Sequence, residues 1–136
     1  MSELFVLDCS VTVAWCFDDE ECIYSEKILR KLLDNGAIVP YLWNLEVTNS
    51  IIIAEKRQRI TVTKMVSFLD ELDVFDITPS SFVPSKHELL STSRAYNLTS
   101  YDSLYLMLAM HERLPLATKD KGLMRACEIA GVELLK

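Results

Sequence analysis

A helix start and a mostly apolar helix are encoded by Thr99–Ser100–Tyr101–Asp102–Ser103–Leu104–Tyr105–Leu106–Met107–Leu108–Ala109. The helical spacing i, i+3, i+4 and i+7 is occupied by apolar side chains, at Tyr101, Leu104, Tyr105 and Leu108. Most neighbouring positions are apolar as well, so we expect this helix to be largely buried. Asp102 lies in its first turn, and a buried carboxylate is costly unless it is paired, hydrogen-bonded or bound to a metal ion.

The chain continues through Leu114–Pro115–Leu116–Ala117–Thr118–Lys119–Asp120, which predicts a turn, a short strand at Leu116–Ala117 and another helix start. Asp120 thus follows a strand directly, just as Asp8 follows the apolar run 4–7. Further strands are predicted at 37–39, 74–77 and 132–135. Helices are predicted at 10–17, before Asn35–Gly36, at 44–57, after Thr61, at 85–96 and at 119–130.

Short strands that alternate with helices are typical of a parallel sheet enclosed by helices. The predicted fold class is therefore α/β, a three-layer α/β/α sandwich with a central, mainly parallel sheet. Ligands of such folds bind outside the carboxyl ends of the strands. Residues at that edge are the first candidates for a functional site.

The composition is that of an ordinary globular chain, and we expect one domain over residues 1–136. No apolar run is long enough to span a membrane and no signal pattern is present, so we expect a soluble, cytoplasmic protein. The net charge of −6 argues against a general nucleic-acid coat, but bound cations can offset a concentrated acidic site in a nuclease. Reduced thiols are expected for the cysteines, which are Cys9, Cys16, Cys22 and Cys127.

Each of four acidic residues has a local structural role available to it. Asp8 can cap the helix after the first strand, and Asp120 can cap the last helix. Glu46 can be a solvated glutamate in the first turn of its helix, where the helix dipole favours a negative charge. Asp102 completes a capping-box pattern that begins at Thr99. These interpretations stay open for each residue taken alone.

Taken together, the same four acids predict a metal site. Asp8 and Asp120 follow strands while Glu46 and Asp102 begin helices, so all four are expected at one edge of the sheet. Carboxylates that lie close together raise one another's pKa values unless a divalent cation holds them. Hard oxygen ligands suit Mg²⁺ or Mn²⁺, which bind substrate phosphates and activate water. The residues indicate metal-dependent phosphoryl transfer, with Asn49 placed one helical turn after Glu46 to orient it.

Other motifs are weak or missing. His87 and His111 are isolated and fit a surface better than a zinc site. The sequence has no GxSxG elbow, P-loop or GxGxxG, which removes the common hydrolase, NTPase and dinucleotide-binding classes. Ser10 stands where a haloacid-dehalogenase-type phosphatase needs a second aspartate. The acidic run 18–21 lacks the spaced ligands of an EF-hand, so a solvated loop is expected there.

Basic residues lie near two of the acids along the chain. Lys56, Arg57 and Arg59 follow the Glu46 helix, while Lys119 and Lys121 flank Asp120. Such residues can hold a nucleic-acid backbone beside an acidic metal site. For each of them, an ordinary solvated helix end is the alternative.

Four blocks of the sequence, in order along nearly the whole chain, carry a family resemblance. The first comprises Leu7–Asp8–Cys9–Ser10–Val11, Ala14–Trp15 and Asp19–Glu20, and the second is Pro40–Tyr41–Leu42–Trp43–Asn44–Leu45–Glu46–Val47–Thr48–Asn49. The third and fourth blocks are residues 98–109 and 114–123. Together they resemble PIN domains, specifically the VapC-type ribonuclease toxins of toxin–antitoxin pairs.

The resemblance implies a PIN-type sandwich and a Mg²⁺- or Mn²⁺-dependent endoribonuclease. Its acidic quartet would be Asp8, Glu46, Asp102 and Asp120, with the three aspartates holding the metal and Glu46 positioning the metal or the water. Supporting polar positions are matched by Ser10, Asn49 and Thr118. Cys9 and Thr48 depart from the usual small residue and alanine, but neither replaces a ligand. The resemblance also implies a homodimer, and a cognate antitoxin that inserts a segment near the acidic pocket.

The hypothesis from the sequence is therefore hydrolysis of RNA phosphodiesters by an activated water, in the toxin of a toxin–antitoxin pair. One alternative is a PIN-domain nuclease of RNA processing or DNA metabolism without a toxin role. The other is an acidic interaction module that does no chemistry. In that case the four acids are independent helix caps and bind no metal.

Overall fold

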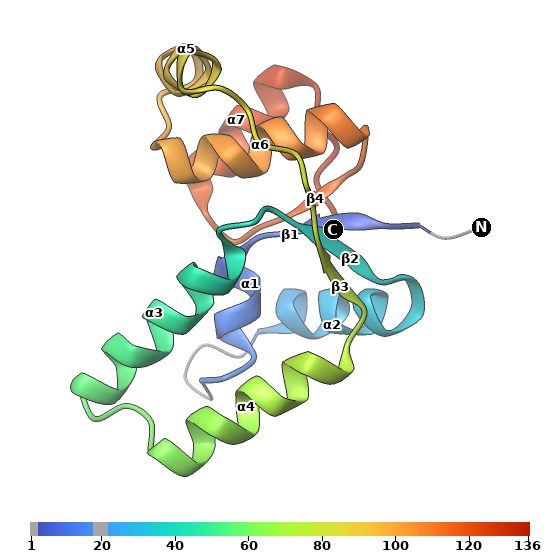
Figure 1. Ribbon diagram of the computed structural model, residues 1–136. Helices are drawn as coiled ribbons and strands as arrows, with labels where there is room; N and C mark the ends of the chain where they lie inside the picture. Colours follow the sequence, from blue (N-terminus) through green and yellow to red (C-terminus); the bar gives the residue numbers. More distant parts are fainter. Residues whose placement is uncertain (1–2, 18–21) are drawn as a thin grey trace.

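A parallel sheet of four strands in the order β3–β2–β1–β4 forms the centre of the computed structural model, which describes residues 3–17 and 22–136 (Figure 1). The strands are β1 (Phe5–Leu7), β2 (Ala37–Val39), β3 (Ile77–Pro79) and β4 (Leu116–Ala117). Val6 lies in register with Ile38 of β2 and with Leu116 of β4, so β1 is an interior strand. The acidic run 18–21, for which the sequence predicts a solvated loop, lies outside the described residues.

Helices cover both faces of this sheet. They are α1 (Cys9–Ala14), α2 (Ile23–Asn35), α3 (Trp43–Lys56), α4 (Val62–Val74), α5 (Lys86–Tyr96), α6 (Ser100–Glu112) and α7 (Lys121–Ala130). Figure 1 shows α6 and α7 on one side of the sheet with α5 beyond them, and α1 to α4 on the other side. The predicted α/β class and its three layers are confirmed.

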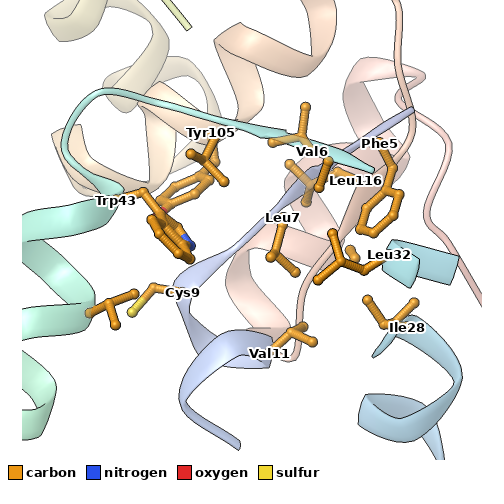
Figure 2. Close-up of a cluster of buried hydrophobic side chains, with 14 of the residues drawn as sticks. Phe5, Val6, Leu7, Cys9, Val11, Ile28, Leu32, Trp43, Tyr105 and Leu116 are labelled. Carbon is orange, nitrogen blue, oxygen red and sulfur yellow. The ribbon is translucent and has the colours of Figure 1, made fainter. Parts of the chain in front are cut away.

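The interior position of β1 explains why its sequence is apolar at every position. Phe5, Val6 and Leu7 are at most 1% exposed, because a layer of helices covers each face of the sheet. Figure 2 shows Leu7 beside Leu32 and Ile28 of α2 in one buried cluster. The strand ends where this apolar run ends, and the next residue is Asp8.

The apolar helix predicted over 99–109 is α6, which is capped by Thr99 and is buried in its middle, from Ser103 to Ala109 except at Met107. Leu104, Leu106 and Leu108 are at most 2% exposed. Tyr101, the first member of the predicted apolar stripe, is instead 60% exposed. A 13-residue helix is about 20 Å long while a two-residue strand covers about 7 Å, so the first turn of α6 extends past the sheet.

Two predicted strands differ from the structure. Helix α4 continues to Val74 and β3 begins only at Ile77, because helical hydrogen bonding persists until the Phe75 amide donates to the Leu72 carbonyl. The predicted strand 132–135 is reduced to one bridge between Leu134 and Leu116. Its partner β4 has only two residues, so the C-terminal segment has too short a strand to pair with over its whole length.

Smaller boundary differences concern the first and last helices, which are shorter than predicted at 10–17 and 119–130. Asp120 is the N-cap of α7, so the helix begins at Lys121. The predicted end of α2 at Gly36 is confirmed; its φ of +79° favours glycine, and a Cβ there would lie 2.7 Å from Asp76 Oδ2.

The four cysteines are free thiols. Within residues 3–17 and 22–136, no helix has the length and apolarity needed to cross a bilayer.

Candidate active site

The four predicted acids reach the carboxyl edge of the sheet from four different connections. Asp8 follows β1, Asp120 comes shortly after β4, Glu46 lies in the first turn of α3 after β2, and Asp102 lies in the first turn of α6. Their charges act on one another: Asp120 raises the pKa of Asp8, while Asp8 raises the pKa values of Glu46 and Asp102. The structure therefore brings the four carboxylates into one electrostatic cluster.

Asp8 is the buried centre of this cluster, with an exposed fraction of 4%. Its Oδ2 accepts hydrogen bonds from Ser10 Oγ at 2.6 Å and from Thr118 Oγ1 at 2.7 Å. Although Asp8 stands at the N-cap position of α1, its side chain makes no capping hydrogen bond, and its carboxylate is held instead by the two hydroxyl groups. Burial raises the pKa of Asp8, and the two hydroxyl hydrogen bonds oppose that shift. Neither hydroxyl group occupies Oδ1.

The same two hydroxyl groups tie the ends of β1 and β4 together. Ser10 Oγ accepts the Lys119 amide at 2.9 Å, and Thr118 Oγ1 accepts the Asp120 amide at 3.0 Å. Each hydroxyl thus donates to Asp8 and accepts from the backbone that leads to Asp120. The family resemblance implies a supporting role for Ser10 and Thr118, and in the structure both hydroxyl groups contact the Asp8 carboxylate.

Substitution Thr118→Val keeps the shape of this buried side chain but removes the hydroxyl donor. We expect a loss of about 1–3 kcal/mol in the free energy of unfolding, because Asp8 loses a partner and the Asp120 amide loses its acceptor. Urea denaturation measures this change. Thr63→Val, on the exposed face of α4, is the matched control and should shift stability by less than about 0.5 kcal/mol. Equal stability of the two variants would contradict the proposed hydroxyl network.

Glu46 is half-buried, and its carboxylate is held by a residue from another helix. Tyr105 of α6 donates its hydroxyl hydrogen to Glu46 Oε1 over 2.6 Å. Burial raises the pKa of Glu46, the Tyr105 hydrogen bond lowers it, and the charges of Asp8 and Asp102 raise it further. This environment differs from that of a solvated first-turn glutamate.

Asn49, the predicted partner of Glu46, is exposed on α3. No hydrogen bond among the described residues joins its side chain to any of the four acids. For Tyr105, the apolar stripe predicts only a place in the core. Its position three residues after Asp102 on one helix face was the available signal for a link to the acids.

Asp102 has the clearest electrostatic signature of the cluster. Burial and the charges of Asp120 and Asp8 raise its pKa from 3.8 to about 6. Thr99 Oγ1 accepts the Asp102 amide at 3.1 Å, so half of the predicted capping box is present. The complete reciprocal box is formed by Ser85 and Glu88 at the start of α5.

Asp120 does have the local role that its position suggests. Its Oδ2 accepts the Leu123 amide at 2.8 Å and caps α7. The side chain is exposed, so its second carboxylate oxygen is open to another partner. Capping and membership of the acidic cluster are therefore compatible in this residue.

The predicted basic residues fall into two places. Lys119 and Lys121 lie on either side of Asp120 and so belong to the edge that carries the acids. Lys56 lies ten residues after Glu46 along α3, a separation of about 15 Å, with Arg57 and Arg59 beyond it. The Arg59 guanidinium also lies 4.2 Å above the Phe17 ring.

The chemistry of the donor set fits a hard divalent cation, for which carboxylate oxygens are the preferred ligands. Burial, and to a smaller extent the charges of neighbouring carboxylates, raises the pKa values of Asp8, Glu46 and Asp102, and a bound cation would offset both effects. Among residues 3–17 and 22–136, however, no three acidic, histidine or cysteine side chains already converge as a metal-holding group. A cation would have to draw the carboxylates together against their mutual repulsion.

Comparison with known proteins agrees with this architecture. A family model described as PIN domain matches residues 5–129. The fold is similar to that in the crystal structure of PAE2754 from Pyrobaculum aerophilum, with a TM-score of 0.69 and 20% sequence identity over 93% of this chain and 87% of that one. No curated protein sequence matches.

Proposed function

This chain belongs to the PIN domain family, and on that premise we propose that it is a Mg²⁺- or Mn²⁺-dependent endoribonuclease. PIN domains are generally nucleases, and they typically use divalent metal ions. The observation that carries the proposal is the buried Asp8 carboxylate, held by two hydroxyl groups beside three further acids. Acids that serve only as independent helix caps would not be expected to lie together in one buried site.

Asp8, Asp102 and Asp120 are the residues that would hold the cation. A divalent cation supplies water activation and stabilises negative charge on a phosphoryl group. Ser10 and Thr118 hold Asp8 in one orientation through Oδ2, which keeps Oδ1 free of both hydroxyl groups. Glu46 would help to position the cation or the attacking water.

Lys119 and Lys121 are proposed to neutralise RNA phosphates next to the scissile bond. Lys56, Arg57 and Arg59 are proposed to hold the RNA backbone farther away, since the length of α3 separates them from Glu46. Asn49 is exposed on the same helix and is assigned to the RNA-facing surface rather than to Glu46.

Incubation of the purified protein with structured and unstructured RNA tests the activity. We expect cleavage with Mg²⁺ or Mn²⁺, loss of cleavage with EDTA, and products with 5′-phosphate and 3′-hydroxyl ends. Those ends follow from attack by water, whereas attack by the 2′-hydroxyl leaves a cyclic phosphate. Cyclic phosphate ends, or cleavage that persists in EDTA, would contradict the proposal. Cleavage of DNA but not RNA would favour a role in DNA metabolism.

We further propose that the enzyme acts in the cytoplasm as the toxin of a toxin–antitoxin pair, as a homodimer restrained by a cognate antitoxin. Induced expression of the single chain of residues 1–136 in bacteria should then arrest growth. Light scattering should give twice the chain mass of 15.5 kDa. Asp102→Asn is the matched control, since it should leave growth unaffected at the same expression level. Equal growth of cells expressing either protein would contradict the toxin role without contradicting nuclease activity.

A further inference from the structure

Tyr105 is a core residue whose hydroxyl group forms a hydrogen bond with an acid of the candidate site. The residue is 0% exposed, and Figure 2 shows its ring near Trp43 in the cluster of buried side chains. Its hydroxyl donates to Glu46 Oε1 over 2.6 Å. Burial and the charges of Asp8 and Glu46 raise the pKa of Tyr105 above its ordinary value, so the phenol remains a donor. The direction of the hydrogen bond is therefore settled.

This hydrogen bond constrains the longest side chain of the acidic cluster. A glutamate has more rotatable bonds than an aspartate, and the charges of Asp8 and Asp102 repel its carboxylate. A short hydrogen bond from a buried donor to a charged acceptor is among the stronger ones in proteins. Because the Tyr105 ring is fixed by the core, its hydroxyl marks a fixed point for the carboxylate.

The start of α3, which carries Glu46, is anchored from a second direction. Trp43 Nε1 donates to Thr12 Oγ1 at 3.2 Å, and Thr12 Oγ1 donates to the Asp8 carbonyl at 3.3 Å. The backbone beneath Glu46 is thus tied to the segment of Asp8. The Tyr105 bond then ties the Glu46 side chain to α6, where Asp102 lies three residues earlier.

We propose that Tyr105 is a positioning residue that holds the Glu46 carboxylate toward Asp8 and Asp102, an inference that rests on the proposed nuclease function. Tyr105 touches neither RNA nor cation in this role and acts only through Glu46. Helix α6 therefore contributes to the site twice, directly through Asp102 and indirectly through Tyr105.

Substitution Tyr105→Phe removes the hydroxyl and keeps the ring. In steady-state cleavage of RNA we expect kcat to fall by about 10- to 100-fold, the range for loss of an orienting hydrogen bond, with KM unchanged. Tyr96→Phe is the matched control, because Tyr96 is half-buried at the end of α5 and makes no hydrogen bond to any of the four acids among the described residues. This control should retain kcat within about twofold. Circular dichroism verifies that both variants are folded at the assay temperature.

A double-mutant cycle separates a positioning role from a merely structural one. Glu46→Asp keeps the charge but withdraws the carboxylate from Tyr105 by one methylene group, so kcat should fall by a similar factor. In the Glu46→Asp background, Tyr105→Phe should then cause no further loss. Independent, multiplying losses would overturn the inference, because Tyr105 would be acting by another route.

The outcomes also separate this inference from the proposed function. An active wild-type protein with an equally active Tyr105→Phe variant overturns the inference alone. A wild-type protein that cleaves no RNA with Mg²⁺ or Mn²⁺ overturns the proposed function, and the inference with it. If Tyr105→Phe does not fold at the assay temperature, the cleavage rate of Glu46→Asp is the test instead. Cleavage by that variant at the wild-type rate overturns the inference.

Discussion

Asp102→Asn abolishes RNA cleavage and, in the metal-free protein, increases stability at neutral pH. The loss of activity should be at least about 100-fold, since the substitution removes a charged oxygen ligand from the site. The gain in stability follows from the cluster itself. An ionised Asp102 is half-buried beside Asp8 and Asp120, and the uncharged amide has nearly the same shape without that repulsion.

The pH dependence of stability gives this prediction its sign. The pKa of Asp102 is about 6 in the folded protein, above its ordinary value of 3.8. Between these pH values the folded state binds more protons than the unfolded state, so this residue makes stability fall as pH rises from about 4 to about 6. Above a pH of about 6, Asp102 is ionised in the folded protein, and the full loss of stability from its charge is present. Asp102→Asn should therefore flatten the decline, and urea denaturation of EDTA-treated protein at several pH values measures it.

The matched control is Asp70→Asn, which removes the same charge from an exposed position on α4. It should keep full cleavage activity and change stability by less than about 0.5 kcal/mol. An Asp102→Asn protein that is inactive but less stable than wild type would indicate that Asp102 has a structural role instead. A variant that cleaves RNA at the wild-type rate would remove Asp102 from the site.

Divalent cations should stabilise the wild-type protein strongly. A cation that binds only the folded state adds about 2.7 kcal/mol to the free energy of unfolding at one hundred times its dissociation constant. The melting temperature should therefore rise with Mn²⁺ or Mg²⁺ and return to its starting value with EDTA. Because carboxylate ligands must be ionised, the rise should be smaller at pH 5 than at pH 7.

Screening of the negative charges by salt could also raise the melting temperature, since the chain has a net charge of −6. Sodium chloride at equal ionic strength controls for it and should give a much smaller rise. The double variant Asp102→Asn/Asp120→Asn should respond to Mn²⁺ no more than to sodium chloride. If wild type and double variant respond equally to Mn²⁺, the acids do not form a metal site and the non-enzymatic interpretation is favoured.

Sequence patterns predicted the elements well where a single periodicity dominates. The apolar run before Asp8, the apolar helix from Ser100 and the stop at Gly36 are all found in the structure. Predictions were wrong where two patterns overlap, as at 74–77, where apolar residues fit both the end of α4 and a strand. The predicted strand 132–135 was wrong because pairing depends on the length of its neighbour β4, which no local pattern contains.

Ser10 and Thr118 are predicted only by the family resemblance, whereas the acids are predicted from chain positions, since each follows a strand or begins a helix. That reasoning places Asp8, Glu46, Asp102 and Asp120 at one edge because parallel strands all end there. Chain position predicts Asn49 as the partner of Glu46, whereas in the structure that partner is Tyr105. Asn49 is close to Glu46 in sequence and polar, whereas the hydrogen bond comes from a residue 59 positions away.

The sequence by itself thus determined the order of strands and helices from β1 to α7, the acids at their junctions and the apolar content of each core element, but not the pairing of residues 132–135. These follow from local periodicity, capping and strand length, which act over a few residues. Only the tertiary structure decided that Asp8 binds two hydroxyl groups instead of capping α1, and that Tyr105 holds Glu46. The physical reason is that burial and hydrogen-bond partners depend on packing between distant segments, and packing alone brings α6 against the start of α3.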